Sequence, residues 1–165
     1  MSMIGYFAAV DEDTLSDLKS DTSLIEEYLY PSDGENEPPN AIDVDKCWHA
    51  IHYLLTGQAL GGDEPYSLAV LGGEDLGEDL GYGPARFLTP EQVEDVAATL
   101  RTVGVDDLAA RYAPEEMELV EIYPGVIWVK DSDNALEYVL ENYERLVEFY
   151  SAAAQRGDGV IIWIA

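Results

Sequence analysis

The sequence has little cysteine, few basic residues and no long apolar run, and each shortage excludes a class of protein. A single cysteine, Cys47, cannot form an internal disulfide, which fits a reducing compartment and predicts a cytoplasmic protein. The first basic residue is Lys19, so the basic start of a secretory signal is missing. Residues 47–62, the longest stretch without Asp, Glu, Lys or Arg, fall short of the roughly 20 apolar residues of a membrane span. We therefore expect neither export nor membrane insertion.

The shortage of bases leaves a strongly negative chain. Lys and Arg number 8 against 34 Asp and Glu, which gives a net charge of −26 spread over the whole sequence. Such a field repels phosphate backbones and anionic lipids, so we expect no nucleic-acid or membrane partner. The acids have two interpretations, a solvated surface or a site for a basic protein.

What is present suffices for one globular domain over residues 1–165. Apolar residues make up 47% of the sequence and aromatic residues 10%. A chain of about 150 residues buries about two-thirds of its unfolded surface, so it needs no disulfide or metal to hold a core.

Both ends of the sequence are apolar, and each predicts a strand. Residues 3–10 and 159–165 are almost continuously apolar, which is typical of strands buried on both faces. We expect the two strands to share one small sheet with helices on each side. The predicted fold is a helix-rich, mixed α/β domain with a three-layer α/β/α sandwich.

Between the ends, periodicity and capping signals favour helices. A capping Thr89, with Pro90 and Gln92 behind it, predicts a helix that ends before Gly104. Asp43 is the expected N-cap of another helix that ends at residues 56–57. The remaining expectations are interrupted helices at 14–30, a proline-rich acidic loop at 31–40, an exposed acidic loop at 72–83, short strands at 86–88 and 126–129, short helices at 105–112 and 114–121, and a long helix at 134–156.

The acidic, glycine-rich segment 72–83 lacks the spacing of a nucleotide-binding loop. Its carboxylates, among them Glu74 and Asp75, would repel the phosphate that such a loop binds. It also lacks the regular spacing of a calcium loop. We expect no cofactor and no metal site.

The two histidines, His49 and His52, lie on the same face of the expected helix as Asp45. That arrangement is compatible with a metal site or with an acid–base pair in which Asp45 orients His52, but the sequence offers no further Cys or His to complete a zinc site and favours a structural role. Cys47 stands near the start of the same helix, where a thiolate is favoured, yet free cysteines are usually buried and inert. No complete catalytic motif is present.

Several short motifs in combination resemble the YfbM-like family, a small bacterial family of unknown function whose fold is an α/β three-layer sandwich. The motifs are Met3-Ile4-Gly5-Tyr6, the pattern from Asp43 to Gly57 with Asp45, Lys46, Trp48 and His52, Ala69-Val70-Leu71-Gly72, Gly83-Pro84-Ala85-Arg86-Phe87-Leu88-Thr89, Ile122-Tyr123-Pro124 and Phe149-Tyr150. In this resemblance His52 belongs to the shared pattern, whereas His49 and the acidic stretches 31–40 and 72–81 do not.

The resemblance leaves one polar set as the first place to look for a site: Asp45, Lys46, Trp48, His52, Thr56, Arg86 and Tyr123. The leading hypothesis is a non-enzymatic binding protein that recognises a protein or small ligand near the Trp48–His52 helix, with Lys46, Trp48, Thr56, Arg86 and Tyr123 as ligand-binding residues. The alternatives are a small hydrolase or transferase with His52 as general base and Asp45 orienting it, and an acidic inhibitor or antitoxin-like partner of a basic protein.

Overall fold

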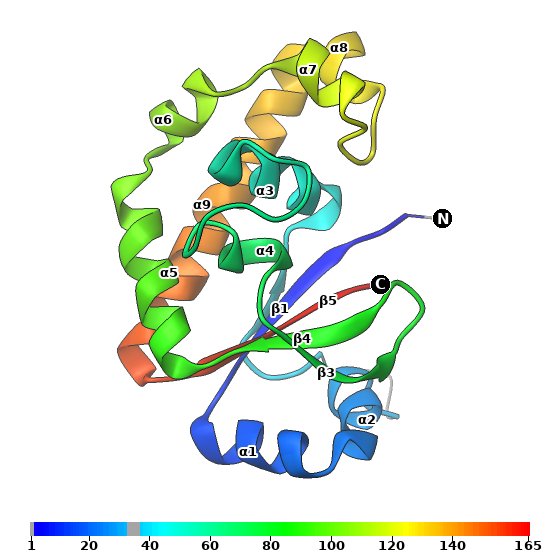
Figure 1. Cartoon of the computed structure of the whole chain (residues 1–165), viewed down its shortest axis with the longest axis vertical. Helices are drawn as coiled ribbons and strands as arrows, with labels where there is room; N and C mark the ends of the chain where they lie inside the picture. Colours follow the sequence, from blue (N-terminus) through cyan, green and yellow to red (C-terminus); the bar gives the residue numbers. More distant parts are fainter. Residues whose placement is uncertain (1, 33–36) are drawn as a thin grey trace.

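The computed structural model describes residues 2–32 and 37–165. Its centre is a sheet of five antiparallel strands in the order β2-β1-β5-β4-β3. The strands are β1 (Gly5–Val10), β2 (Ala41–Asp43), β3 (Glu74–Asp79), β4 (Pro84–Leu88) and β5 (Gly159–Ile164). The prediction that both ends of the sequence share one sheet is confirmed, because β1 and β5 pair over their full length (Figure 1).

Alternation along the central strands produces two separate hydrophobic cores. In β1, Phe7 belongs to one core and Ala8 to the other, and in β5 the same holds for Ile162 and Ile161. Successive side chains of a strand point to opposite faces, so a strand that is apolar throughout needs cover on both sides. The three-layer sandwich is therefore confirmed.

Helices supply that cover (Figure 1). The smaller core lies under α1 and α2, and the larger core lies under α3, α4, α5 and α9, with α6, α7 and α8 beyond them. The helices and 3-10 turns are α1 (Glu12–Ser20), η1 (Thr22–Leu24), α2 (Ile25–Leu29), η2 (Asp45–Cys47), α3 (Trp48–Thr56), α4 (Leu68–Leu71), α5 (Pro90–Thr102), α6 (Val105–Ala110), α7 (Pro114–Leu119), α8 (Ile127–Lys130) and α9 (Ser132–Arg156).

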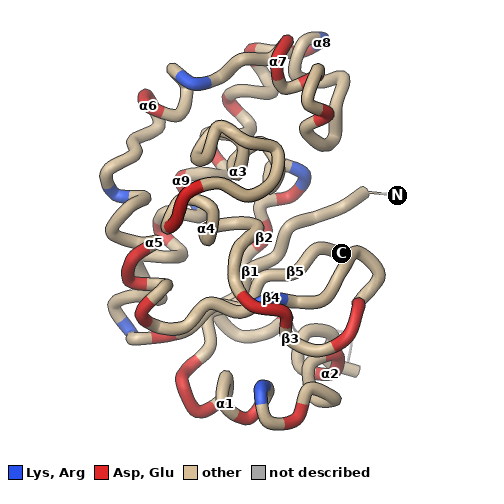
Figure 2. Tube along the Cα trace, in the orientation of Figure 1, with Lys and Arg blue, Asp and Glu red and all other residues tan. Residues whose placement is uncertain are grey.

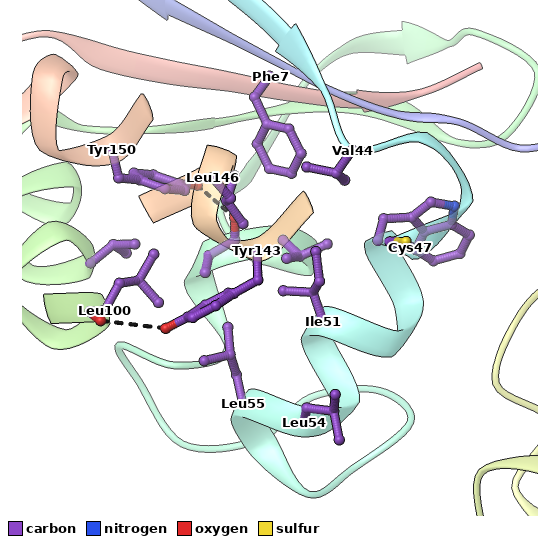
Figure 3. Packing of buried hydrophobic residues seen from close by; sticks show 14 of the residues in the cluster. Phe7, Val44, Cys47, Ile51, Leu54, Leu55, Leu100, Tyr143, Leu146 and Tyr150 are labelled. Atoms are coloured by element: carbon purple, nitrogen blue, oxygen red, sulfur yellow. Dashed lines mark hydrogen bonds between the residues drawn. The ribbon is translucent and has the colours of Figure 1, made fainter. Parts of the chain in front are cut away.

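Acidic residues occur along most of the elements, whereas the few basic residues are scattered singly along the chain (Figure 2). The larger core beneath is closely packed: Phe7 of β1, Ile51 of α3 and Leu146 of α9 converge in it (Figure 3). Tyr143 of α9 donates its hydroxyl to the carbonyl oxygen of Val103 at 2.6 Å. Like-charged neighbours on the outer face of the long helix α9 destabilise it. Packing of its buried face therefore stabilises this helix.

Signals at helix ends are confirmed at two places. Thr89 and Gln92 form a reciprocal capping box at the start of α5. Gly57 ends α3 in the left-handed conformation with a φ of 74°, and its N–H donates to the carbonyl oxygen of Tyr53 at 2.7 Å. Both signals are local, so the sequence alone carries them.

Three local predictions are wrong. Asp43 is not the N-cap of a helix: it pairs with Tyr6 as the last residue of β2, and its carboxylate accepts the N–H of Asp45 at 2.9 Å. The acidic segment 72–83 is not a loop, because residues 74–79 form the edge strand β3, in which only Leu76 is buried. Residues 126–129 are not a strand, since Trp128 anchors the short helix α8 by burying its ring and donating to the carbonyl oxygen of Ile122.

The proline-rich loop at 31–40 is described only in part, since residues 33–36, Asp33 and Glu35 among them, lie outside the described residues. Within the described part of the chain, no helix has both the length and the apolar character that a membrane crossing requires.

Candidate functional site

A groove of about 990 Å³ lies between the start of α3 and the pair α7 and α8. Trp48 and His49 of α3 and Tyr123 of the loop between α7 and α8 form one wall, and the rim carries Leu119 and Val129. Two of the seven residues that the sequence singles out, Trp48 and Tyr123, therefore line this groove.

The aromatic wall is fixed by hydrogen bonds as well as by stacking. Trp48 stacks on His49 and on Tyr123, with ring centroids 5.0 and 5.6 Å apart. Its indole N–H donates to the carbonyl oxygen of Met3 at 3.0 Å, and the N–H of Met3 donates to the Tyr123 hydroxyl at 2.8 Å. Gly5 makes this packing possible, because a Cβ there would come within 2.7 Å of the Trp48 Cβ. The wall is thus held by stacking, by two hydrogen bonds and by close packing against Gly5.

His49 holds two loops against the wall. Its Nδ1 accepts the N–H of Tyr123 at 2.9 Å, so the proton resides on Nε2, which lies 2.9 Å from the carbonyl oxygen of Ala59. Burial lowers the pKa of His49, while the Ala59 carbonyl opposes that shift. Because both ring nitrogens already have partners, this neutral imidazole has no free position with which to take a proton from a substrate.

The rim of the groove is apolar and exposed to an unusual degree. Leu119 at the end of α7 is 83% exposed, and Val126 and Val129 around α8 are 64% and 44% exposed. They lie together because α7 and α8 are in contact. Met117 of α7 and Trp128 of α8 are fully buried, which leaves Leu119, Val126 and Val129 on the outside. Apolar residues gathered in this way at the edge of a groove are typical of a surface that another molecule covers.

Glutamates complete the rim. Glu115 and Glu118, one helical turn apart on α7, and Glu121 just after it line the groove and are exposed. No lysine or arginine occurs anywhere from residue 112 to residue 129. The groove therefore combines an aromatic wall, an apolar rim and negative charge.

The other predicted site residues lie elsewhere. Asp45 accepts a hydrogen bond from the hydroxyl of Tyr138 on α9, and the backbone N–H of Lys46 donates to the same hydroxyl at 3.4 Å. Burial, followed by the bond to Asp45, raises the pKa of Tyr138. Among the described contacts, Asp45 is thus bound to α9 and not to His52.

His52 is a core residue. Its side chain is 1% exposed, and neither ring nitrogen has a hydrogen-bond partner among the described residues. Burial lowers its pKa to about 4, a positive charge on His49 or Arg86 acts in the same direction, and the Gly61 backbone opposes that shift. His52 is therefore a neutral imidazole at physiological pH, and it does not line the groove.

Arg86 and Thr56 anchor backbone groups. The guanidinium of Arg86, half-buried on β4, donates to the carbonyl oxygen of Leu71, and burial lowers its pKa while Asp75 opposes that shift. Thr56 donates its hydroxyl to the carbonyl oxygen of His52 at 2.8 Å and faces a smaller pocket of about 450 Å³ beside Arg111. Neither residue lines the groove of Trp48 and Tyr123.

Cys47 is fully buried, and burial raises its pKa to about 12, so it remains a neutral thiol. Across residues 2–32 and 37–165, no three His, Cys, Asp or Glu side chains are grouped so that they could hold a metal ion. The structure thus gives the cysteine a packing role in the larger core.

Sequence reasoning did not find the apolar rim. Leu119, Val126 and Val129 were assigned to the end of a helix and to a strand, where apolar residues are expected to be buried. The available signal was the complete absence of bases from 112 to 129 next to adjacent apolar residues at Leu119 and Val120.

Comparisons with known proteins agree with this fold. A family model described as "Domain of unknown function (DUF1877)" matches residues 1–163. Protein YfbM of Escherichia coli (strain K12) is 29% identical over 167 residues, covering 96% of this chain and 95% of the relative. The crystal structure of YfbM from Escherichia coli, described as a protein of unknown function, aligns with a TM-score of 0.77 and 25% identity over 98% of this chain and 99% of that chain.

Proposed function

The chain belongs to the DUF1877 family, and from the groove beside α7 and α8 we propose that it is a non-enzymatic interaction protein that binds a segment of a partner protein. One observation carries the proposal: exposed Leu119, Val126 and Val129 stand directly beside a preformed aromatic wall. Interfaces between proteins are built around such aromatic and aliphatic anchors. A reduced Cys47 fits a cytoplasmic location for this activity.

The side chains of the groove favour binding over catalysis. His49 is the one imidazole that lines it, and both of its ring nitrogens are engaged. Since His52 is buried and Asp45 is bound to Tyr138, no observation favours the alternative of a hydrolase or transferase.

A site-specific photo-cross-linker tests the proposal. We expect the cross-linker at Leu119 to capture a partner from an extract of the source organism, whereas the same group at Leu60 captures none. Leu60 is a matched control because it is 72% exposed and lies outside the groove. The captured protein is then purified and its affinity measured against the double variant Leu119→Ser/Val129→Ser. Equal capture from both positions, or an affinity that the double variant leaves unchanged, contradicts the proposal.

A further inference from the structure

We propose that the partner segment is cationic as well as apolar, with lysines or arginines that lie over Glu115, Glu118 and Glu121 while its apolar side chains cover Leu119 and Val129. This class of partner presupposes the proposed function of the groove, the binding of a protein segment. Such a partner would contact the acidic residues and the apolar residues of the groove at the same time.

The first support is the sign and placement of the charges at the rim. Glu115 and Glu118 lie on one side of α7 because residues three apart in a helix are neighbours, and Glu121 follows after the helix ends. Within the described part of the chain, none of the three carboxylates forms a salt bridge. The nearest bases in the sequence, Arg111 and Lys130, do not line the groove. The rim therefore presents negative charge that the chain itself does not neutralise.

The second support is the exclusion of other occupants by charge. A second copy of this chain would bring another net charge of −26 to the same face, and an anionic lipid surface would be repelled in the same way. Like charges placed against each other are a strong penalty in an interface, whereas opposite charges speed association and fix orientation. Of the occupants that could cover an apolar rim, a basic protein segment is the one that this field attracts.

The apolar contacts and the ion pairs of this groove are expected to contribute differently to binding. Exposed ion pairs contribute little individually, so the apolar rim and the aromatic wall supply most of the affinity. The three glutamates select the sign of the partner. Loss of all three should weaken binding of a cationic segment about tenfold, as three modest surface ion pairs would together.

The test uses synthetic peptides and the protein of 165 residues. The probe is a fluorescent amphipathic peptide of about 14 residues with leucine at helical spacing and lysine at the other positions. A second peptide replaces its lysines by glutamate, and a third replaces its leucines by serine. Fluorescence anisotropy gives the affinity of each peptide in dilute and in molar salt.

Two triple variants separate the groove from the general charge. Glu115→Gln/Glu118→Gln/Glu121→Gln removes the charge of the rim. Glu74→Gln/Glu78→Gln/Glu148→Gln removes the same charge from exposed positions on β3 and α9 that do not line the groove. Thermal melts establish that each variant folds, as expected for substitutions at exposed positions.

The proposal requires that the lysine–leucine peptide bind, that the rim variant weaken it about tenfold and that the control variant change it by less than about twofold. Added salt should weaken binding to the native protein more than binding to the rim variant. The double variant Leu119→Ser/Val129→Ser should also lose affinity.

Other outcomes overturn it in different ways. If the glutamate–leucine peptide binds as well, or if both triple variants lose affinity equally, the groove does not select a cationic segment. If no peptide binds while the cross-linker at Leu119 still captures a partner, the class of partner is wrong and the proposed function stands. If both experiments fail, the proposed function fails as well. Concentration-dependent dimerisation that Leu119→Ser/Val129→Ser abolishes would assign the face to a second copy.

Discussion

Protonation of His52 offers a quantitative test of how the core is built. In the folded protein the pKa of this imidazole is lowered to about 4, first by burial and then by the charges of His49 and Arg86, from an ordinary value of 6.5. The unfolded chain therefore binds a proton over a range of pH in which the folded chain does not. The stability that neutral His52 contributes is complete above pH 6.5 and is lost as the pH falls toward 4.

The magnitude follows from the two pKa values. A separation of about 2.5 pH units at about 1.36 kcal/mol per unit gives a loss of about 3 kcal/mol at pH 4. The figure applies to a buried group, and the His52 side chain is 1% exposed. A loss of this size is a large part of the stability of an ordinary domain.

The matched perturbation is His52→Leu, which places an apolar side chain of similar size at this position, and that side chain cannot be protonated. Urea denaturation at pH 7 and at pH 4 gives the unfolding free energy of both proteins. We expect the variant to gain about 3 kcal/mol relative to the native protein between these two pH values. The many carboxylates titrate in both proteins, so their effect cancels in the comparison. A difference that stays constant to within about 0.5 kcal/mol would mean that His52 is hydrated or hydrogen-bonded, and would refute the reasoning.

Three further predictions concern the wall, a helix cap and the net charge. Gly5→Ala should lower the unfolding free energy by about 1–3 kcal/mol in urea titrations, because its Cβ would meet the Cβ of Trp48 at 2.7 Å; an unchanged midpoint would contradict the described packing. Thr89→Ala should cost about 1 kcal/mol through loss of the cap on α5, whereas Thr99→Ala in the same helix should be neutral or stabilising, so equal losses would argue against the cap. Molar sodium chloride should raise the melting temperature above its value in dilute buffer, because it screens a net charge of −26. An unchanged melting temperature would contradict this prediction.

The sequence was informative wherever the decisive interactions are local or follow a regular period. The apolar ends specified the central strands, because a strand buried on both faces must be apolar at every position. Thr89 and Gly57 marked helix ends through hydrogen bonds within a few residues. The long helix α9 followed from its period alone.

The sequence was misleading where tertiary contacts decide. Strand β3 consists largely of glycine and acids, which are poor strand formers, and it exists because β4 offers it a partner. Its charged side chains protect an exposed sheet edge from further pairing. Residues 126–129 have the composition of a strand, yet Trp128 is buried as part of the helix α8, which begins after Val126, and the side chains of Val126 and Val129 are exposed.

The sequence predicted part of the candidate site and missed the rest. Trp48 and Tyr123 belong to the set of seven that the sequence singles out, and these two do lie together. His52 and Asp45 were placed together by helical geometry, but Asp45 lies in a 3-10 turn before α3 and finds Tyr138 instead. Tyr138 is distant in sequence, so no local pattern could have indicated that partner.

The position of β5 in the sheet has a consequence for biosynthesis. It lies between β1 and β4, and it follows the other four described strands in the sequence. Until it emerges from the ribosome, the pairs β2-β1 and β4-β3 have no hydrogen bonds to each other, and the inner edge of each is unpaired. We expect the nascent chain to hold two separate sheet fragments with open edges and to close into one sheet in a single late step, when the last strand inserts between them.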